Sequence, residues 1–162
     1  MAKGSGSTRI RKKDSGVDYY ARSKEARAEA LEVANSYKEK PLRESVTNEI
    51  TLDLEITKSD IKTILGKNDP KDNKFNYWKN VAAKDILQFI NDSKYEGWMP
   101  PVDGKHKESL FFAYYSRKSG KKLILCLRKM KDTGRCKPYA IISNKTFNHD
   151  IKTRGIIKGI PR

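Results

Sequence analysis

The stretch SLFFAYYSRKSGKKLILCLRKMKDTGRCKPYAIIS, residues 109–143, decides the fold of this chain. Apolar and polar side chains alternate along much of it, and aromatic and aliphatic residues are frequent, which is typical of strands. Ser119-Gly120 and Asp132-Thr133-Gly134 interrupt the alternation and are typical of hairpin turns. The pattern therefore predicts three antiparallel strands, at Ser109–Ser116, Lys122–Met130 and Lys137–Ser143.

The residues before this stretch predict the rest of the domain. Apolar residues recur every three or four positions from Phe75 to Asn91, which predicts a helix with a core-facing side. Strict alternation from Glu49 to Ile56 predicts a half-buried strand. A short helix follows, capped by Thr57 or Ser59 and ended by Gly66, and Tyr95–Met99 forms a further short strand.

The N-terminal 45 residues differ in composition from the rest. Residues 1–17 are Gly, Ser, Lys and Arg with few apolar side chains, and we expect a disordered basic arm. Asp18 to Lys40 is rich in Ala, Glu and Lys, which predicts a polar helix that Pro41 ends. Its polarity leaves open whether it projects from the domain or packs on a partner.

These elements predict an α+β fold, with N-terminal helices followed by a four-stranded antiparallel sheet that carries a helix on one face. Residues 144–162 are expected to form a basic tail with one short element near Thr146–Asp150. The expected division is a disordered arm at 1–17, a polar helix at 18–45, an α+β domain at 46–150 and a basic tail at 151–162.

The basic charge is concentrated at the ends and in the C-terminal half. The 162 residues include 35 Lys or Arg and 20 Asp or Glu, a net charge of +15, yet residues 18–102 are nearly neutral. Residues 103–143 hold eleven basic and three acidic side chains. This asymmetry favours a polyanionic partner over a merely soluble surface.

Several classes of protein do not fit the sequence. No run of about 18 apolar residues is present, and the first residues lack the apolar region of a secretory signal, so no membrane contact is expected. Cys126 and Cys136 are not arranged as a zinc site or a disulfide framework. No nucleotide-binding loop or HExxH motif occurs. We expect no cofactor and no metal.

The turns also predict how residues divide between the faces of the sheet. The first face is expected to meet the helix and to carry Leu110, Phe112, Tyr114, Leu123, Leu125, Leu127, Ala140 and Ile142. The second is expected to carry Phe111, Ala113, Tyr115, Arg117, Ile124, Cys126, Arg128, Tyr139, Ile141 and Ser143, with Arg128 between Phe111 and Tyr139. This mixed second face suits either water or a nucleic-acid strand. A one-residue slip in a turn would exchange the faces of a strand.

His106 is the side chain best suited to proton transfer. It lies between Lys105 and Lys107, and these like charges are expected to lower its pKa. A base poised near neutrality is what proton transfer needs. An exposed loop histidine is the alternative interpretation, and His149 is expected to be an ordinary tail residue. RNA supplies its own nucleophile, the 2′-hydroxyl, so its cleavage needs proton transfer and cations rather than a metal. The few carboxylates of the basic half do not favour a two-metal site.

The segments Gly104-Lys105-His106, SLFFAYYSR (109–117), LCLRKM (125–130) and KPYAII (137–142) resemble the phage-borne nuclease domains of the barnase–EndoU–colicin–RelE class. Such domains accompany head-morphogenesis proteins of Mu-like phages. The resemblance covers about residues 46–150. It implies a helix followed by a four-stranded antiparallel sheet, and metal-independent RNA cleavage on its open face. The matching positions are Lys105, His106, Arg128 and Tyr139.

The leading hypothesis is a metal-independent endoribonuclease of phage or toxin type. His106 would move the proton, Lys105, Arg117 and Arg128 would hold the phosphate, and Tyr115, Tyr139 and Ser143 would bind the substrate; Tyr115, Arg117 and Ser143 come from the register alone. The expected partners are RNA, with tRNA among the candidates, and a phage head or immunity protein. The expected location is the bacterial host cytoplasm or the virion. The alternatives are a non-catalytic nucleic-acid-binding packaging or capsid protein, and an interaction module docked through its N-terminal helix.

Overall fold

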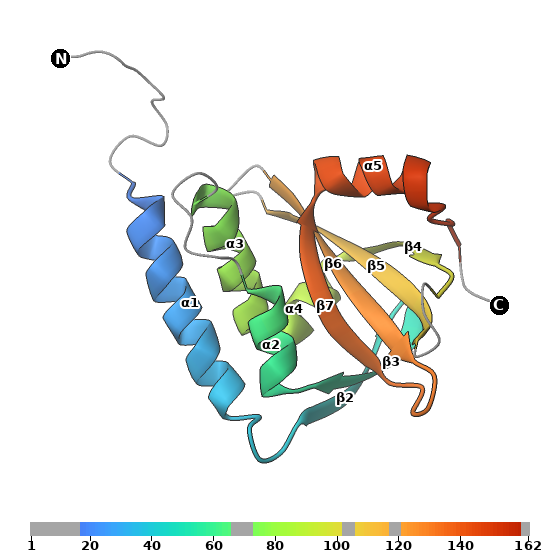
Figure 1. The fold of residues 1–162 in the computed structure, drawn as a ribbon, viewed down its shortest axis with the longest axis horizontal. Helices are drawn as coiled ribbons and strands as arrows, with labels where there is room; N and C mark the ends of the chain where they lie inside the picture. Colours follow the sequence, from blue (N-terminus) through green and yellow to red (C-terminus); the bar gives the residue numbers. More distant parts are fainter. Residues whose placement is uncertain (1–16, 66–72, 102–105, 117–120, 160–162) are drawn as a thin grey trace, which may run out of the picture.

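The computed structural model describes residues 17–65, 73–101, 106–116 and 121–159. They form five helices and six strands within these ranges (Figure 1). The helices are α1 (Tyr19–Asn35), α2 (Lys58–Ile64), α3 (Asn73–Lys84), α4 (Ile86–Asp92) and α5 (Asn144–Arg154). The strands are β2 (Leu42–Asn48), β3 (Ile50–Ile56), β4 (Lys94–Met99), β5 (His106–Ser116), β6 (Lys121–Met130) and β7 (Cys136–Ser143).

All six strands join one mixed sheet in the order β2-β3-β7-β6-β5-β4. The β3–β7 pair is parallel, and the other neighbouring pairs are antiparallel. The α+β class is therefore confirmed, whereas the predicted four-stranded antiparallel sheet has two strands too few and misses the parallel pair. β2 was missed because its sequence, LRESVTN, is largely exposed at the sheet edge and lacks an apolar alternation.

Helices cover the first face of the sheet (Figure 1). The main core lies between these helices and the first face. It contains Phe112 and Leu125 of the sheet together with Ile61 of α2 and Ile86 and Phe89 of α4. The chain from 75 to 91, expected to be one helix, is divided at Asp85 into α3 and α4. The Asp85 carboxylate accepts a hydrogen bond from the Gln88 N–H at 3.1 Å, which begins α4 as an N-cap.

The N-terminal helix is part of the domain rather than a projecting arm. α1 ends at Asn35, before the expected Lys40, and packs on α3 and α2. Small residues permit this close approach, because Ala30 and Ala34 of α1 are fully buried. The Asn80 side chain of α3 donates to the Ser23 hydroxyl at 3.1 Å, within the same interface. Residues 42–45 belong to β2 and not to a helical segment.

The register of the first hairpin differs from the prediction by two residues, so its faces are as expected. Phe111 lies opposite Cys126, and Ser109 takes the expected place of Phe111 opposite Arg128. The β5–β6 turn is longer than predicted, because Ser116 pairs with Lys121. An even shift moves residues along the strand without exchanging its faces.

The second hairpin differs by an odd number of residues, which exchanges the faces of much of β7. Cys126 pairs with Ala140 and Leu127 with Pro138, so Tyr139 is the extra residue of a β-bulge. Pro138 has no N–H to donate to the ladder, which suits it to this position. Ile141 therefore packs in the main core, whereas Ala140 and Ile142 pack on the second face. Ser143 pairs with Leu123 of the first face, so our placement of these four residues was wrong.

The second face is covered, and our expectation of an open face was wrong. Residues 144–154 form α5 instead of the expected short element, and Phe147 of α5 packs on Phe111 at 5.5 Å between ring centroids. Beyond α5, Ile157 pairs with Trp98 through backbone hydrogen bonds of 2.7 and 2.8 Å. This bridge approaches Gly97 so closely that a Cβ there would lie 2.6 Å from the Ile157 oxygen.

Candidate functional site

The structure describes five of the seven candidate site residues, four of them with their side chains. Lys105 and Arg117 lie outside the described residues. His106 begins β5, and its backbone pairs with Met130, two positions after Arg128 in β6. For His106 the structure describes the backbone alone. This pairing places His106 and Arg128 at the same end of the sheet.

Arg128 and Tyr139 form a direct pair at this end. The guanidinium carbon of Arg128 lies 4.0 Å from the centroid of the Tyr139 ring, a close cation–π contact. Tyr139 lies on the second face, as expected, and it meets Arg128 there although Lys137 is the residue in register with Arg128. Arg128 itself is half-buried, and its Nε is buried without a hydrogen-bond partner among the described residues.

The Tyr139 hydroxyl lies in a polar environment made by three elements. The side chains of Ser109 and Cys126 form hydrogen bonds with it, and Arg154 of α5 acts on it electrostatically. Burial, together with Cys126, raises the pKa of Tyr139, although Ser109, Arg128 and Arg154 oppose this rise. Tyr139 is therefore a neutral phenol at pH 7. One face of its ring is in contact with Arg128, which makes it a support for the guanidinium rather than a free stacking surface.

Tyr115 and Ser143 lie at the other end of the sheet. Tyr115 pairs with Lys122, six residues along β5 from Ser109 and so roughly 20 Å from Arg128. It is 62% exposed and lines an apolar groove of about 600 Å³ that also contains Trp78 and Phe89. Ser143 caps α5 by accepting a hydrogen bond from the Thr146 N–H at 3.1 Å. The structure therefore separates both residues from Arg128.

Many basic side chains near the Arg128 end form ion pairs within the fold. Arg43, Arg135 and Lys137 surround Glu55 at 2.9, 3.8 and 3.7 Å, and Lys137 also contacts Asp60 at 2.8 Å. Partial burial alone would raise the pKa of Glu55, but the hydrogen bond from Arg43 and the three cations lower it overall. These cations stabilise the ends of β2, β3 and β7 and are partly neutralised there.

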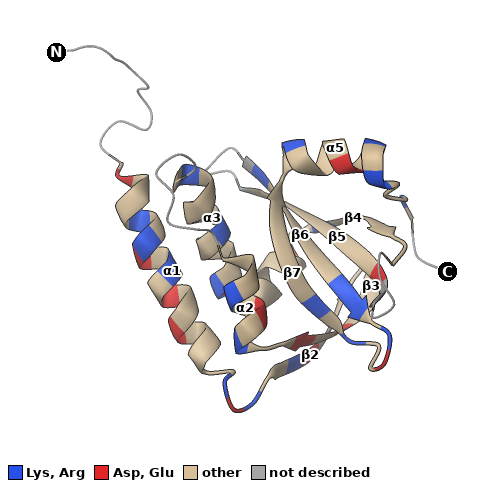
Figure 2. Ribbon diagram, in the orientation of Figure 1, with Lys and Arg blue, Asp and Glu red and all other residues tan. Residues whose placement is uncertain are grey.

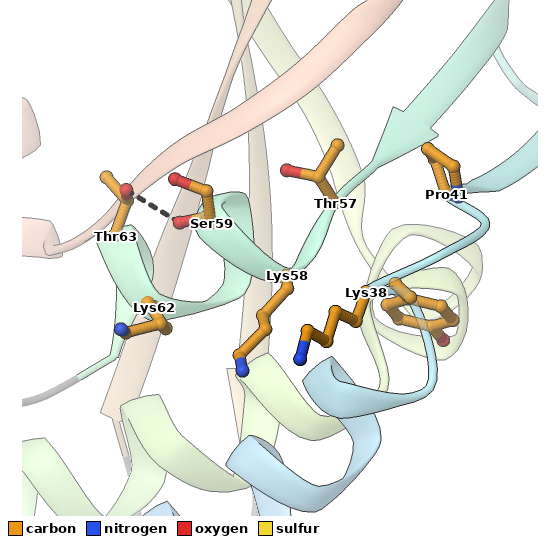
Figure 3. A pocket seen from close by; sticks show the side chains of 8 residues that line it. Lys38, Pro41, Thr57, Lys58, Ser59, Lys62 and Thr63 are labelled. Atoms are coloured by element: carbon orange, nitrogen blue, oxygen red, sulfur yellow. Dashed lines mark hydrogen bonds between the residues drawn. The ribbon is translucent and has the colours of Figure 1, made fainter.

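A second cationic region was missed by the sequence analysis. Figure 2 shows that basic positions also occur on α2. Lys38, Lys58 and Lys62 line a groove of about 560 Å³ between the end of α1 and α2, which we call the lysine groove (Figure 3). The near-neutral charge of residues 18–102 concealed it. The spacing of four between Lys58 and Lys62, which places them on one helix face, was the available signal.

Other chemistry has little support in the described part of the chain. No group of three or more His, Cys, Asp or Glu side chains there could hold a metal ion. Cys126 and Cys136 are free and buried, and burial raises their pKa values to about 12 and about 11. His149 is exposed on α5. None of the helices in the described ranges has the length and apolar character needed to cross a membrane.

Comparisons of the chain with protein-family models, with curated proteins and with solved structures found no match.

Proposed function

We propose that this chain is a metal-independent endoribonuclease whose centre lies where β5 begins, beside Arg128 and Tyr139. The observation that carries the proposal is the fixed guanidinium of Arg128, stacked on Tyr139 at the sheet end where the His106 backbone pairs with Met130. A planar guanidinium held in one orientation suits a phosphate with developing charge, because less rotamer freedom is lost on binding.

The chemistry assigns each group a role. In RNA the 2′-hydroxyl attacks the adjacent phosphorus, the bond to the 5′-oxygen breaks, and a 2′,3′-cyclic phosphate and a 5′-hydroxyl form. His106 takes the 2′-proton or supplies the proton to the leaving oxygen. Arg128 and Lys105 stabilise the charge on the phosphorane oxygens. Tyr139 positions Arg128, and we place Tyr115 and Ser143 outside the centre because of their distance.

The non-catalytic alternative is a nucleic-acid-binding protein, and one observation favours it. The sheet face expected to hold RNA is covered by α5, whose Phe147 is 3% exposed. The proposed centre therefore lies at the end of the sheet and not on its face. Binding without turnover would support this alternative.

A comparison of the two histidines tests the proposal. His106→Ala and His149→Ala are assayed on a fluorescently labelled single-stranded RNA in EDTA. We expect His106→Ala to lose roughly 10²-fold or more in rate, the contribution of one proton-transfer group, and His149→Ala to retain the wild-type rate. Arg128→Lys keeps the charge but not the planar stacking, and should also be slower. A folded His106→Ala protein with the wild-type rate would remove His106 from the mechanism.

A further inference from the structure

The lysine groove presents three ammonium groups to one open space. Lys38 follows α1, and Lys58 and Lys62 lie one turn apart on α2 (Figure 3). Tyr37 and Pro41 form the rest of the wall beside Lys38. The groove is wide and open to solvent, so it suits an extended chain better than an enclosed small molecule.

The charge of these lysines is not compensated by the carboxylates that the structure describes. None of the three forms an ion pair with any of them, in contrast to Lys137 and Lys129, which do. Asp60, the acidic residue of α2, is already engaged: its carboxylate accepts from the Thr57 N–H and contacts Lys137, both at 2.8 Å. The groove therefore keeps an excess of three positive charges.

Hydroxyl groups in the groove can add hydrogen bonds to an anion. Thr57 Oγ1 accepts from the Asp60 N–H at 3.2 Å, so its own proton remains available to donate. Ser59 lies one position from Lys58 and lines the same groove. Thr63, by contrast, donates to the Ser59 carbonyl at 2.9 Å and is already used as a donor. Ammonium and hydroxyl donors together match phosphate oxygens.

We propose that the lysine groove binds the phosphate backbone of RNA. Taking RNA as the polyanion rests on the proposed function. Lysines are flexible point charges rather than rigid forks, so they suit contacts to successive phosphates without sequence preference.

The groove is connected to the proposed centre through one residue. Lys137 lies opposite Arg128 in the β6–β7 ladder, and its ammonium group contacts Asp60 of α2. Lys137 thus links α2, which carries two of the groove lysines, to the strand position beside Arg128.

A charge-matched pair of triple variants tests this binding site. The groove variant is Lys38→Gln, Lys58→Gln and Lys62→Gln. The control is Lys94→Gln, Lys145→Gln and Lys158→Gln, which removes the same charge from exposed lysines on other elements. Both are made in the His106→Ala background, so that the RNA stays intact. Circular dichroism and thermal unfolding check that each variant folds, and the three single groove variants serve if the triple variant does not.

The measurement is the affinity for a labelled single-stranded RNA at several salt concentrations. Each phosphate contact to a single strand contributes about 0.7 to the slope of log K against log salt. We expect the groove variant to lose about 2 from that slope and about tenfold or more in affinity at low salt. The control should change much less in both.

Equal slopes and affinities for the two variants would overturn the proposal. The proposal would also be overturned if the groove variant lost binding to vesicles of anionic lipid while its RNA binding was unchanged. That result would assign the groove to a membrane surface. The outcome is independent of turnover. If the wild-type protein does not cleave RNA, but the groove variant binds RNA more weakly than the control, the proposed function fails and the groove proposal is supported. If the wild-type protein cleaves RNA, but the groove variant binds RNA as tightly as the control, the groove proposal fails and the proposed function is supported.

Discussion

Replacing Phe147 by Ala should detach α5 from the sheet and expose Cys126. Phe147 is 3% exposed and packs with Phe111, Ala113, Ile124 and Cys126, and its ring lies 5.5 Å from that of Phe111. Phe147 is the buried residue of α5, and the partly buried Ile151 is the other α5 side chain described as packing on this cluster, so we expect Phe147 to contribute most to holding α5 on the second face.

The magnitude follows from the burial. Truncating a buried Phe to Ala costs about 3–5 kcal/mol, which includes about 0.5–1.5 kcal/mol from the aromatic pair. A loss of about 3 kcal/mol raises the population of the detached state on the order of 100-fold. Global stability should fall by a similar free energy if α5 unfolds together with the sheet.

Thiol labelling gives the local readout, and urea unfolding gives the global one. Cys126 is 2% exposed with a pKa of about 12, so an aromatic disulfide reagent at pH 8 should label it slowly in the native protein. In Phe147→Ala we expect labelling at Cys126, located by mass spectrometry, to accelerate on the order of 100-fold. Tyr115→Ala, which removes an exposed ring, is the control. Rapid labelling of Cys126 in the wild-type protein, or none in Phe147→Ala, would refute the covered second face.

Three further predictions concern the fold. Gly97→Ala places a Cβ 2.6 Å from the Ile157 oxygen, so we expect a loss of about 1–3 kcal/mol in urea unfolding, and an unchanged midpoint would argue against the Ile157–Trp98 bridge. Asn80→Ala leaves the buried Ser23 hydroxyl without its 3.1 Å partner, so thermal unfolding should show a loss of about 1–3 kcal/mol in the free energy of unfolding. A stability equal to that of the wild type would contradict the packing of α1 on α3. The pKa of Glu55 is lower in the folded state, so its contribution to the free energy of unfolding is present above its unfolded pKa and is lost as the pH falls through its folded pKa. The free energy of unfolding, measured from pH 7 to pH 3, should therefore fall less steeply in Glu55→Gln than in the wild type. Parallel curves for the two proteins would contradict this.

Local patterns predicted most elements correctly. The alternation in β3, β5, β6 and β7 follows from side chains that point to opposite faces of a half-buried strand, and the structure has a strand at each position. Thr57 was one of two expected caps, and it forms a capping box with Asp60. The break at Asp85 could not be read from apolar spacing, because α3 and α4 together continue the same periodicity.

Long-range pairing set the limit of the sequence analysis. β2 is held by its pairing with β3 and carries little apolar signal of its own. The parallel contact of β3 with β7 joins Leu54 to Cys136, residues far apart in the chain. The bulge at Tyr139 could not be predicted from turn chemistry, and it alone reverses the faces of the following residues.

The same limit applies to the candidate site. Arg128 and Tyr139 were predicted as neighbours, and they are in contact, although Tyr139 reaches Arg128 through a bulge instead of the expected register. Tyr115 and Ser143 were grouped with them because they were expected to share a face, which ignored their distance along the strands. The spacing of Lys58 and Lys62 indicated one helix face, but no local pattern could place Lys38, which follows α1, beside them.

The central claim is that this chain cleaves RNA without a metal. The most direct measurement is incubation of the purified protein with total RNA in EDTA, followed by chemical mapping of the ends that form. The account predicts discrete fragments with 2′,3′-cyclic phosphate and 5′-hydroxyl ends, absent with His106→Ala. Intact RNA that nevertheless migrates as a complex on a native gel would contradict it and would identify a nucleic-acid-binding protein instead.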